Sequence, residues 1–199
     1  MNEVSKTRAA TIACLLLALV LAGCSADRGE PPLKGAAIGG PFALTDQDGR
    51  PKTDRDFAGR YRIMYFGFTH CPDVCPTDLA ILGQALRRFE KSDPARAARV
   101  VPVFVSVDPE RDTPAVLKDY VAAFHPRLVG LTGTPAQIAD TVKRYGAYGQ
   151  KEAPEAGGGY NVNHSRLAEL IGPGGEPIAL LPYDKGAEAV AAELDRWVE

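Results

Sequence analysis

Two short, continuous apolar runs constrain the fold of this chain more than any other feature. They occupy residues 62–68 (RIMYFGF) and 100–107 (VVPVFVSV). Runs of this length are typical of strands that are covered on both faces. Between them, apolar residues recur at helical spacing and form a single stripe of Leu79, Leu82, Leu86 and Phe89. Buried strands that alternate with amphipathic helices predict an α/β fold, with a central sheet covered by helices on both faces.

Weaker local signals complete the predicted element order, βββαβαβαββα. Residues 41–53 alternate around Asp48-Gly49, which is a strong signal for a hairpin turn. Thr113-Pro114 and Thr134-Pro135 each place a capping hydroxyl before a proline, as at the start of a helix. A second hairpin is expected around the GPGGE turn, followed by a closing helix over about residues 187–198. The Gly-rich residues 150–160 are predicted to form a mobile loop.

The first 40 residues indicate an export signal followed by a tether. Lys6 and Arg8 precede an apolar run over residues 9–22, which is too short for a comfortable membrane span of about 20 residues. The run ends in LAGC, which looks like a bacterial lipobox. We therefore expect a lipoprotein signal peptide over 1–23, a lipidated Cys24 with a flexible tether over 24–40, and the folded domain over 41–199. An uncleaved N-terminal anchor is the alternative.

Both interpretations place the domain on the extracytoplasmic, periplasmic side of a bacterial membrane, held there by its N-terminus. Several acyl chains would anchor it firmly, because a single chain binds a membrane only marginally. The chain has 23 basic and 25 acidic side chains, a net charge of −2. No stripe of Lys and Arg appears, so the sequence argues against nucleic acid as a partner.

Only two of the four cysteines are expected to belong to the folded domain. Of the four cysteines, Cys14 lies in the expected signal peptide and Cys24 is the expected lipid anchor, which leaves Cys71 and Cys75. A disulfide between residues four apart closes a very small loop and stabilises a fold little. We therefore expect the pair to be chemically active.

The pair follows the predicted strand at 62–68, where α/β folds usually place their sites. Pro72 and Pro76 restrict the backbone, so the helix is predicted to begin near Pro76, with both thiols before it and favoured as thiolates by the helix dipole. Two thiolates and the imidazole of His164 suit Cu(I), and also Cu(II) if a further ligand joins. Zinc usually takes four ligands. The pair can also form a redox-active disulfide, so the residues leave metal binding and thiol exchange open.

Four segments in order resemble the Sco/SenC family: FGFTHCPDVCPTDL, SVDPERDTP, GLTG and NHSRLAELIGPGGE. The resemblance covers about residue 42 to the C-terminus. Members of that family are membrane-attached, thioredoxin-like copper proteins linked to cytochrome c oxidase assembly. The resemblance implies a thioredoxin-like fold, with a central mixed sheet and an N-terminal hairpin. It also implies Cys71, Cys75 and His164 as copper ligands and Asp108 as a supporting residue. Asn163 departs from the pattern, because many relatives have Asp there.

The resemblance further implies a metallochaperone that delivers copper to the binuclear centre of cytochrome c oxidase subunit II. Its cysteines must be reduced to bind copper, which predicts a thioredoxin-like periplasmic reductant as a partner, and another copper chaperone is a candidate donor. One alternative is a thiol–disulfide oxidoreductase, an enzyme in which Cys71 attacks a disulfide and Cys75 resolves the mixed intermediate. A redox or copper sensor is another. His164 favours copper binding, because thiol exchange needs no distant imidazole.

Overall fold

The computed structural model describes residues 29–154 and 157–199. The expected signal peptide, Cys14 and the expected lipidation site Cys24 lie outside these residues. Within the described part of the chain, no helix is both long enough and apolar enough to cross a membrane.

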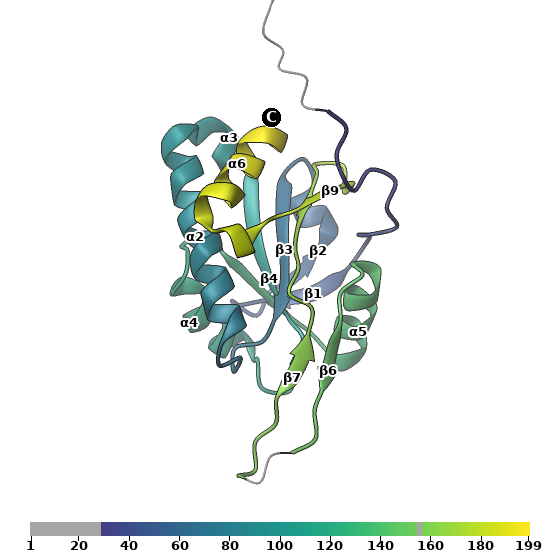
Figure 1. Cartoon of the computed structure of the whole chain (residues 1–199). Coiled ribbons are helices and arrows are strands. Elements are labelled where there is room, and N and C mark those ends of the chain that lie inside the picture. The colour runs from purple at the N-terminus through teal and green to yellow at the C-terminus, as the bar shows by residue number, and fades with distance from the viewer. Residues whose placement is uncertain (1–28, 155–156) are drawn as a thin grey trace, which may run out of the picture.

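A seven-stranded mixed sheet forms the centre of the molecule (Figure 1). Its strand order is β2-β1-β5-β4-β3-β8-β9. The two apolar runs form its parallel central strands, 61–67 and 100–106. Their register runs from Tyr61 opposite Val100 to Gly67 opposite Ser106. Every residue of these two strands is buried. The seven strands are β1 (Ala43–Asp46), β2 (Pro51–Thr53), β3 (Tyr61–Gly67), β4 (Val100–Ser106), β5 (Val129–Thr132), β8 (Ala168–Ile171) and β9 (Pro177–Leu180).

Helices cover both faces of the sheet, as predicted (Figure 1). The first face packs against α2, α4 and α6, and the second against α5 and the 3-10 turn η1. The predicted caps are present, since the Thr113 and Thr134 hydroxyls accept from the backbone N–H groups three residues on. The helices are α2 (Val74–Ser92), α3 (Pro94–Ala98), α4 (Pro114–Ala122), α5 (Pro135–Arg144) and α6 (Ala187–Trp197), with 3-10 turns η1 (Asp54–Phe57) and η2 (Tyr183–Lys185).

A further hairpin overlaps the start of the region predicted as a loop. Strands β6 (Gly149–Lys151) and β7 (Val162–His164) pair antiparallel, with Gly149 opposite His164, and form a separate two-stranded sheet. The loop prediction was therefore wrong at its beginning, because Gln150 and Lys151 are polar and carry no local strand pattern. At Gly149 a Cβ atom would lie 2.8 Å from Cβ of Val107, so the hairpin backbone packs closely against the end of β4.

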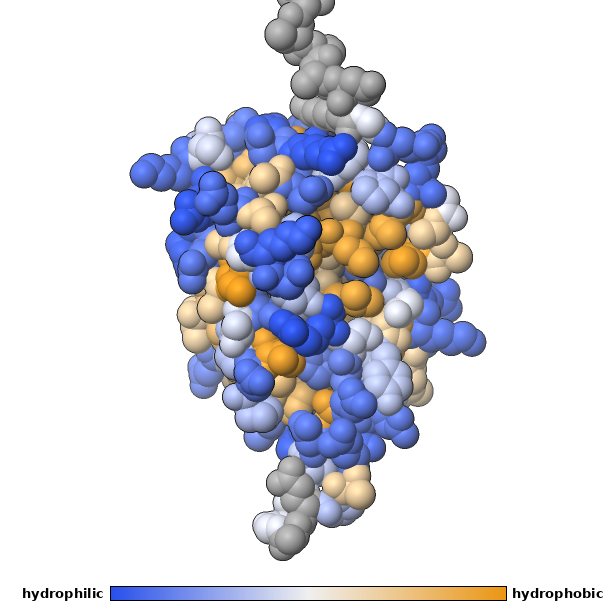
Figure 2. Space-filling view, in the orientation of Figure 1, coloured by the Kyte–Doolittle hydropathy of each residue, from blue (hydrophilic) through white to orange (hydrophobic). Residues whose placement is uncertain are grey.

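The described part of the expected tether lies against the domain. The Leu33 amide donates to the Ile178 carbonyl of edge strand β9 at 3.0 Å, and the Gly39 amide donates to the Arg144 carbonyl at 2.9 Å. An edge strand offers unpaired backbone groups, and this segment uses one of them. Figure 2 shows apolar side chains gathered in the upper right of the face, where Figure 1 shows the N-terminal segment. Residues 33–40 therefore lie against the folded domain.

Candidate metal centre

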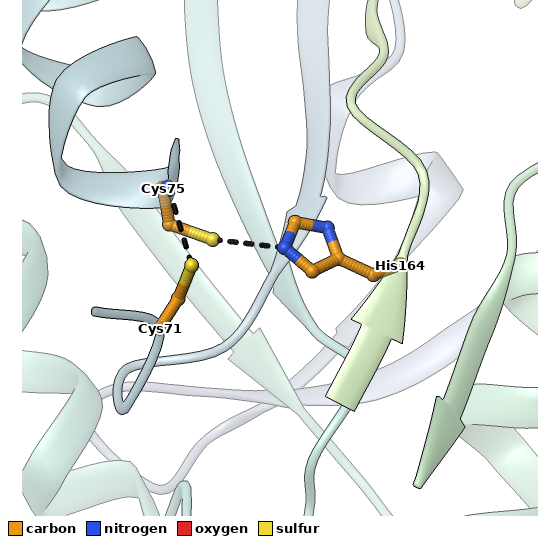
Figure 3. Close-up of side chains that lie close together, drawn as sticks. All are labelled: Cys71, Cys75 and His164. Atoms are coloured by element: carbon orange, nitrogen blue, oxygen red, sulfur yellow. Dashed lines mark hydrogen bonds between the residues drawn. The ribbon is translucent and has the colours of Figure 1, made fainter. Parts of the chain in front are cut away.

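Three side chains predicted from the sequence meet at one end of the sheet (Figure 3). The sulfur atoms of Cys71 and Cys75 and a ring nitrogen of His164 all lie within 4.8 Å of one another. The Cys75 Sγ atom is 3.3 Å from Nε2 of His164, and both cysteines are free thiols. In the described residues, no further His, Cys, Asp or Glu belongs to this group.

The turn between β3 and α2 positions the two thiols differently. The Cys71 amide donates to the Phe68 carbonyl at 3.2 Å, which closes a turn directly after the strand. Helix α2 begins at Val74, so Cys75 lies within its first turn, and the prediction of a start near Pro76 with both thiols before it was wrong for Cys75. Proline is tolerated in a first turn, where its missing N–H has no helical partner. The Cys75 amide instead donates to Sγ of Cys71 at 3.4 Å.

A glycine in β3 makes room for the Cys75 thiol. A Cβ atom added to Gly67 would lie 2.7 Å from Sγ of Cys75 and 3.1 Å from the rings of Phe104 and Tyr65. Gly67 was not among the residues predicted for the centre. It could have been predicted, because a glycine inside an otherwise apolar strand often marks a close approach of other atoms to the backbone.

Burial dominates the electrostatics of Cys75. The side chain has no exposed area, and burial raises the pKa of its thiol above the ordinary value. The Phe68 backbone and the Tyr65 hydroxyl lower this pKa, and neighbouring Cys71 raises it. The expected stabilisation of a thiolate by the helix start is therefore outweighed at Cys75. A metal ion that binds there must displace the thiol proton.

The backbone carbonyl of the next residue orients the imidazole of His164. Its Nδ1 atom lies 2.8 Å from the carbonyl oxygen of Ser165. A carbonyl oxygen only accepts hydrogen bonds, so Nδ1 carries the proton and the lone pair of Nε2 faces the thiols. The ring also makes an edge contact with Phe68, with 5.6 Å between centroids and 85° between planes. His164 can therefore bind a metal ion through the lone pair of Nε2.

Asp108 lies near the centre but outside the ligand group. Its buried carboxylate accepts from the Tyr160 hydroxyl at 2.8 Å and pairs with Arg111. The Arg111 guanidinium stacks over the Tyr160 ring at 3.7 Å and donates to the Tyr160 carbonyl at 3.0 Å. These contacts join the loop after β4 to the segment that leads into β7. Arg111 and Tyr160 were missed in the sequence analysis, because their contact spans 49 residues.

Asp112 fastens the loop that precedes Cys71. Its fully buried carboxylate accepts from the Thr69 amide at 3.0 Å and from the Thr69 hydroxyl at 2.6 Å. It also accepts from the Ser106 hydroxyl at 2.6 Å. Asp112 belongs to the SVDPERDTP segment, in which only Asp108 was expected to support the metal centre. The segment therefore supports both sides of the centre.

A cavity of about 300 Å³ opens beside the three side chains. The start of α2 and strand β7 line it, and Cys71, Asn163 and His164 are among its residues. Cys71 is 9% exposed, whereas Cys75 is fully buried. A partner can therefore approach the centre from the side of Cys71 and His164.

Comparison with known proteins points to the SCO1/SenC family. A family model described as SCO1/SenC matches residues 30–199. The protein "SCO1 homolog 1, mitochondrial" of Arabidopsis thaliana is 45% identical over 145 residues, which cover 72% of this chain and 42% of that protein. The chain spans about half the length of the curated relatives it matches.

Solved structures agree with this family and with the predicted fold. ScoI of Bradyrhizobium japonicum with copper bound matches with a TM-score of 0.74 and 42% identity, covering 81% of this chain and all of that one. A thioredoxin domain of a thiol-disulfide oxidoreductase from Bacteroides vulgatus matches with a TM-score of 0.57 and 14% identity, covering 83% and 98%. The second likeness concerns the fold alone. The thioredoxin-like fold with a central mixed sheet is therefore confirmed.

Proposed function

The chain belongs to the SCO1/SenC family, and on that premise we propose that it is a copper-binding metallochaperone. The observation that carries the proposal is the meeting of two thiols and one imidazole within 4.8 Å beside an open cavity. Two thiolates and an imidazole are a soft donor set that suits Cu(I) in trigonal geometry, and Cu(II) if a further ligand joins. The copper bound by the Bradyrhizobium relative supports the same choice of metal.

The residues of the centre have distinct tasks in binding and release. Cys71, Cys75 and His164 hold the ion, and both thiols lose their protons as it binds. The Ser165 carbonyl keeps Nε2 of His164 aimed at the sulfurs. Cys75 is fully buried, so an incoming ligand from a partner reaches the ion from the side of Cys71 and His164. Release by ligand exchange then begins on that side.

The proposed recipient is the binuclear copper centre of cytochrome c oxidase subunit II, which the family resemblance implies. A disulfide between Cys71 and Cys75 would remove two ligands, so the protein depends on a thioredoxin-like periplasmic reductant. Another copper chaperone is the proposed donor. The lipobox at Cys24 supports a lipid-anchored protein on the extracytoplasmic face of a bacterial membrane. In this scheme Asp108 supports the centre through Tyr160 and the hairpin that carries His164.

Thiol–disulfide exchange is the second candidate function. The observation that favours it is the unequal exposure of two free, adjacent thiols on a thioredoxin-like fold. The more accessible Cys71 would attack a substrate disulfide and form a mixed disulfide. The buried Cys75 would then attack Sγ of Cys71, release the reduced substrate and leave an intramolecular disulfide. In this function His164 has no necessary part.

Titration with Cu(I) separates the two candidates. The reduced protein is titrated beside His164→Ala and His70→Ala. His70 is the matched control, because it adjoins Cys71 yet is exposed and bonds to Thr69 instead of joining the ligand group. We expect one copper per chain in the wild type and the His70 variant, and much weaker binding in His164→Ala. Equal affinity in all three proteins, or no stoichiometric binding in any, would contradict the chaperone and favour exchange.

A further inference from the structure

A buried carboxylate lies one helical turn beyond Cys75. Asp78 is in α2, only 2% exposed, and points into the core instead of toward solvent. A charged group in such a place is costly unless its hydrogen bonds are satisfied. Asp78 has three donors, which come from two other parts of the chain.

Arg166 supplies two of these donors in a fork. Its Nη2 atom donates to Oδ1 of Asp78 at 2.7 Å, and its Nε atom donates to Oδ2 at 3.1 Å. Arg166 is two residues after His164, in the segment between β7 and β8. A bidentate pair fixes the relative position of two groups more closely than a single bond does. The pair therefore ties the helix of Cys75 to the strand of His164.

Tyr65 extends this connection to the cysteine itself. Its hydroxyl donates to Oδ2 of Asp78 at 2.9 Å, and its ring lies beside Gly67, as does the thiol of Cys75. Tyr65 lies in β3 and is 1% exposed. On the other side, the Tyr183 hydroxyl donates to the Arg166 carbonyl, and the Arg166 guanidinium lies 5.4 Å from the Tyr183 ring centre. Arg166 is thus held at its backbone and at its guanidinium.

We propose that Asp78 and Arg166 are positioning residues that set the distance between His164 and Cys75 before a metal ion arrives. Neither touches the ion. The pair holds β7 against the first turns of α2, so that Nε2 of His164 stays near the sulfurs in the metal-free protein. Without the fork, the short hairpin β6–β7 keeps its three backbone-paired positions, the Tyr160 contacts, the packing of Gly149 against Val107 and the contact of His164 with Phe68. The proposal rests on the proposed copper site and adds two residues to it.

The test measures Cu(I) affinity by competition with a chromophoric chelator. The protein is the reduced full chain in detergent, with Arg166→Gln, Arg166→Lys and Asp78→Asn as variants. We expect Arg166→Gln to weaken binding by about 10- to 100-fold, the usual effect of losing a residue that orients a metal ligand. Arg166→Lys keeps the charge opposite Asp78 but cannot form the fork. It should fold like the wild type and still bind copper more weakly.

A double-mutant cycle with His164→Ala tests the route of the effect. If Arg166 acts through His164, then Arg166→Lys should change the affinity little when His164 is already alanine. Arg127→Lys is the matched control, because Arg127 also binds a carboxylate, that of Glu90, but donates to the Val100 carbonyl at the far end of β4. That variant should bind copper like the wild type. In the metal-free protein, hydrogen exchange at residues 162–166 should be faster in Arg166→Lys than in Arg127→Lys.

Two results would overturn the proposal. The first is wild-type affinity and exchange in Arg166→Lys, while His164→Ala still loses copper; the copper site would then stand without the positioning pair. The second is an equal loss from Arg166→Lys with and without His164, which would assign Arg166 a general effect on stability. Failure of the wild type to bind copper would instead contradict the proposed function on which the inference rests.

Discussion

At the scale of single residues, Gly67 shows how closely the Cys75 thiol is packed. Replacement by alanine would place a methyl carbon 2.7 Å from Sγ, so the sulfur or the β3 backbone must move. We expect Gly67→Ala to lose about 1–3 kcal/mol of stability through overpacking and to bind Cu(I) at least about tenfold more weakly, as for a misplaced ligand. Thermal unfolding and chelator competition measure the two effects.

Gly130→Ala is the matched control for this change. Gly130 is also buried in a strand, and a Cβ atom there would lie 3.0 Å from Val121, well away from the thiols. Its alanine variant should lose stability but keep the copper affinity of the wild type. Unaltered affinity in Gly67→Ala would mean that the thiol adapts to the methyl group.

Glu169 gives a prediction about pH. It is fully buried in β8, and burial raises the pKa of its carboxyl from 4.5 to about 8. Between these values the folded protein holds a proton that the unfolded chain has released, so stability is present at low pH and falls as pH rises toward 8. The expected slope in this window is about 1.4 kcal/mol per pH unit at most. Above pH 8 the decline should level off.

Denaturant unfolding at pH 5, 6, 7 and 8 measures this effect. Glu169→Gln has no titrating group at this position and should lose the corresponding part of the decline. Glu188→Gln, on the exposed first turn of α6, should retain it. Parallel stability curves for the wild type and Glu169→Gln would show that Glu169 does not ionise in this range.

At the scale of elements, the hairpin β6–β7 is the weakest support of the metal centre. It forms a separate two-stranded sheet and is tied to the rest of the molecule partly through Tyr160 and Asp108. Tyr160→Phe removes one part-buried hydroxyl donor, worth about 1 kcal/mol net, but keeps the ring between Arg111 and Lys151. We expect hydrogen exchange in residues 149–154 and 157–164 to become about fivefold faster. Tyr148→Phe, whose hydroxyl bonds only to nearby Gln150 in the described residues, should change exchange less.

The same hairpin contains a strand that no sequence pattern predicts. Strands β3 and β4 were predictable because buried runs carry their own signal, and the helices at Pro114 and Pro135 because a capping threonine precedes each proline. The polar β6 has no such pattern and forms because its partner β7 lies beside it. The meeting of Cys71, Cys75 and His164 was predictable from residue chemistry together with the family resemblance. Its supporting pair, Asp78 and Arg166, was not, because that contact spans 88 residues.

At the scale of the whole molecule, the described N-terminal segment and the metal centre lie at opposite ends of the sheet. Figure 1 shows the described N-terminal segment at one end of the sheet and β6 and β7 at the other. Residues 33–40 bond to β9 and to the end of α5, and the Tyr145 hydroxyl donates to the Gly40 carbonyl at 3.3 Å. If Cys24 is a lipid anchor, this arrangement directs the metal centre away from the membrane and toward a partner.

This separation predicts that stability and copper binding can be changed independently. A chain that begins at Pro41 lacks the bonds from Leu33 and Gly39 that a chain beginning at Gly29 retains. At about 1 kcal/mol per bond, partly offset by the ordering of the segment, the shorter chain should melt a few degrees lower. Both should bind one Cu(I) with equal affinity, because no removed residue lines the cavity at Cys71. Weaker copper binding by the shorter chain would show that the two ends of the sheet are coupled.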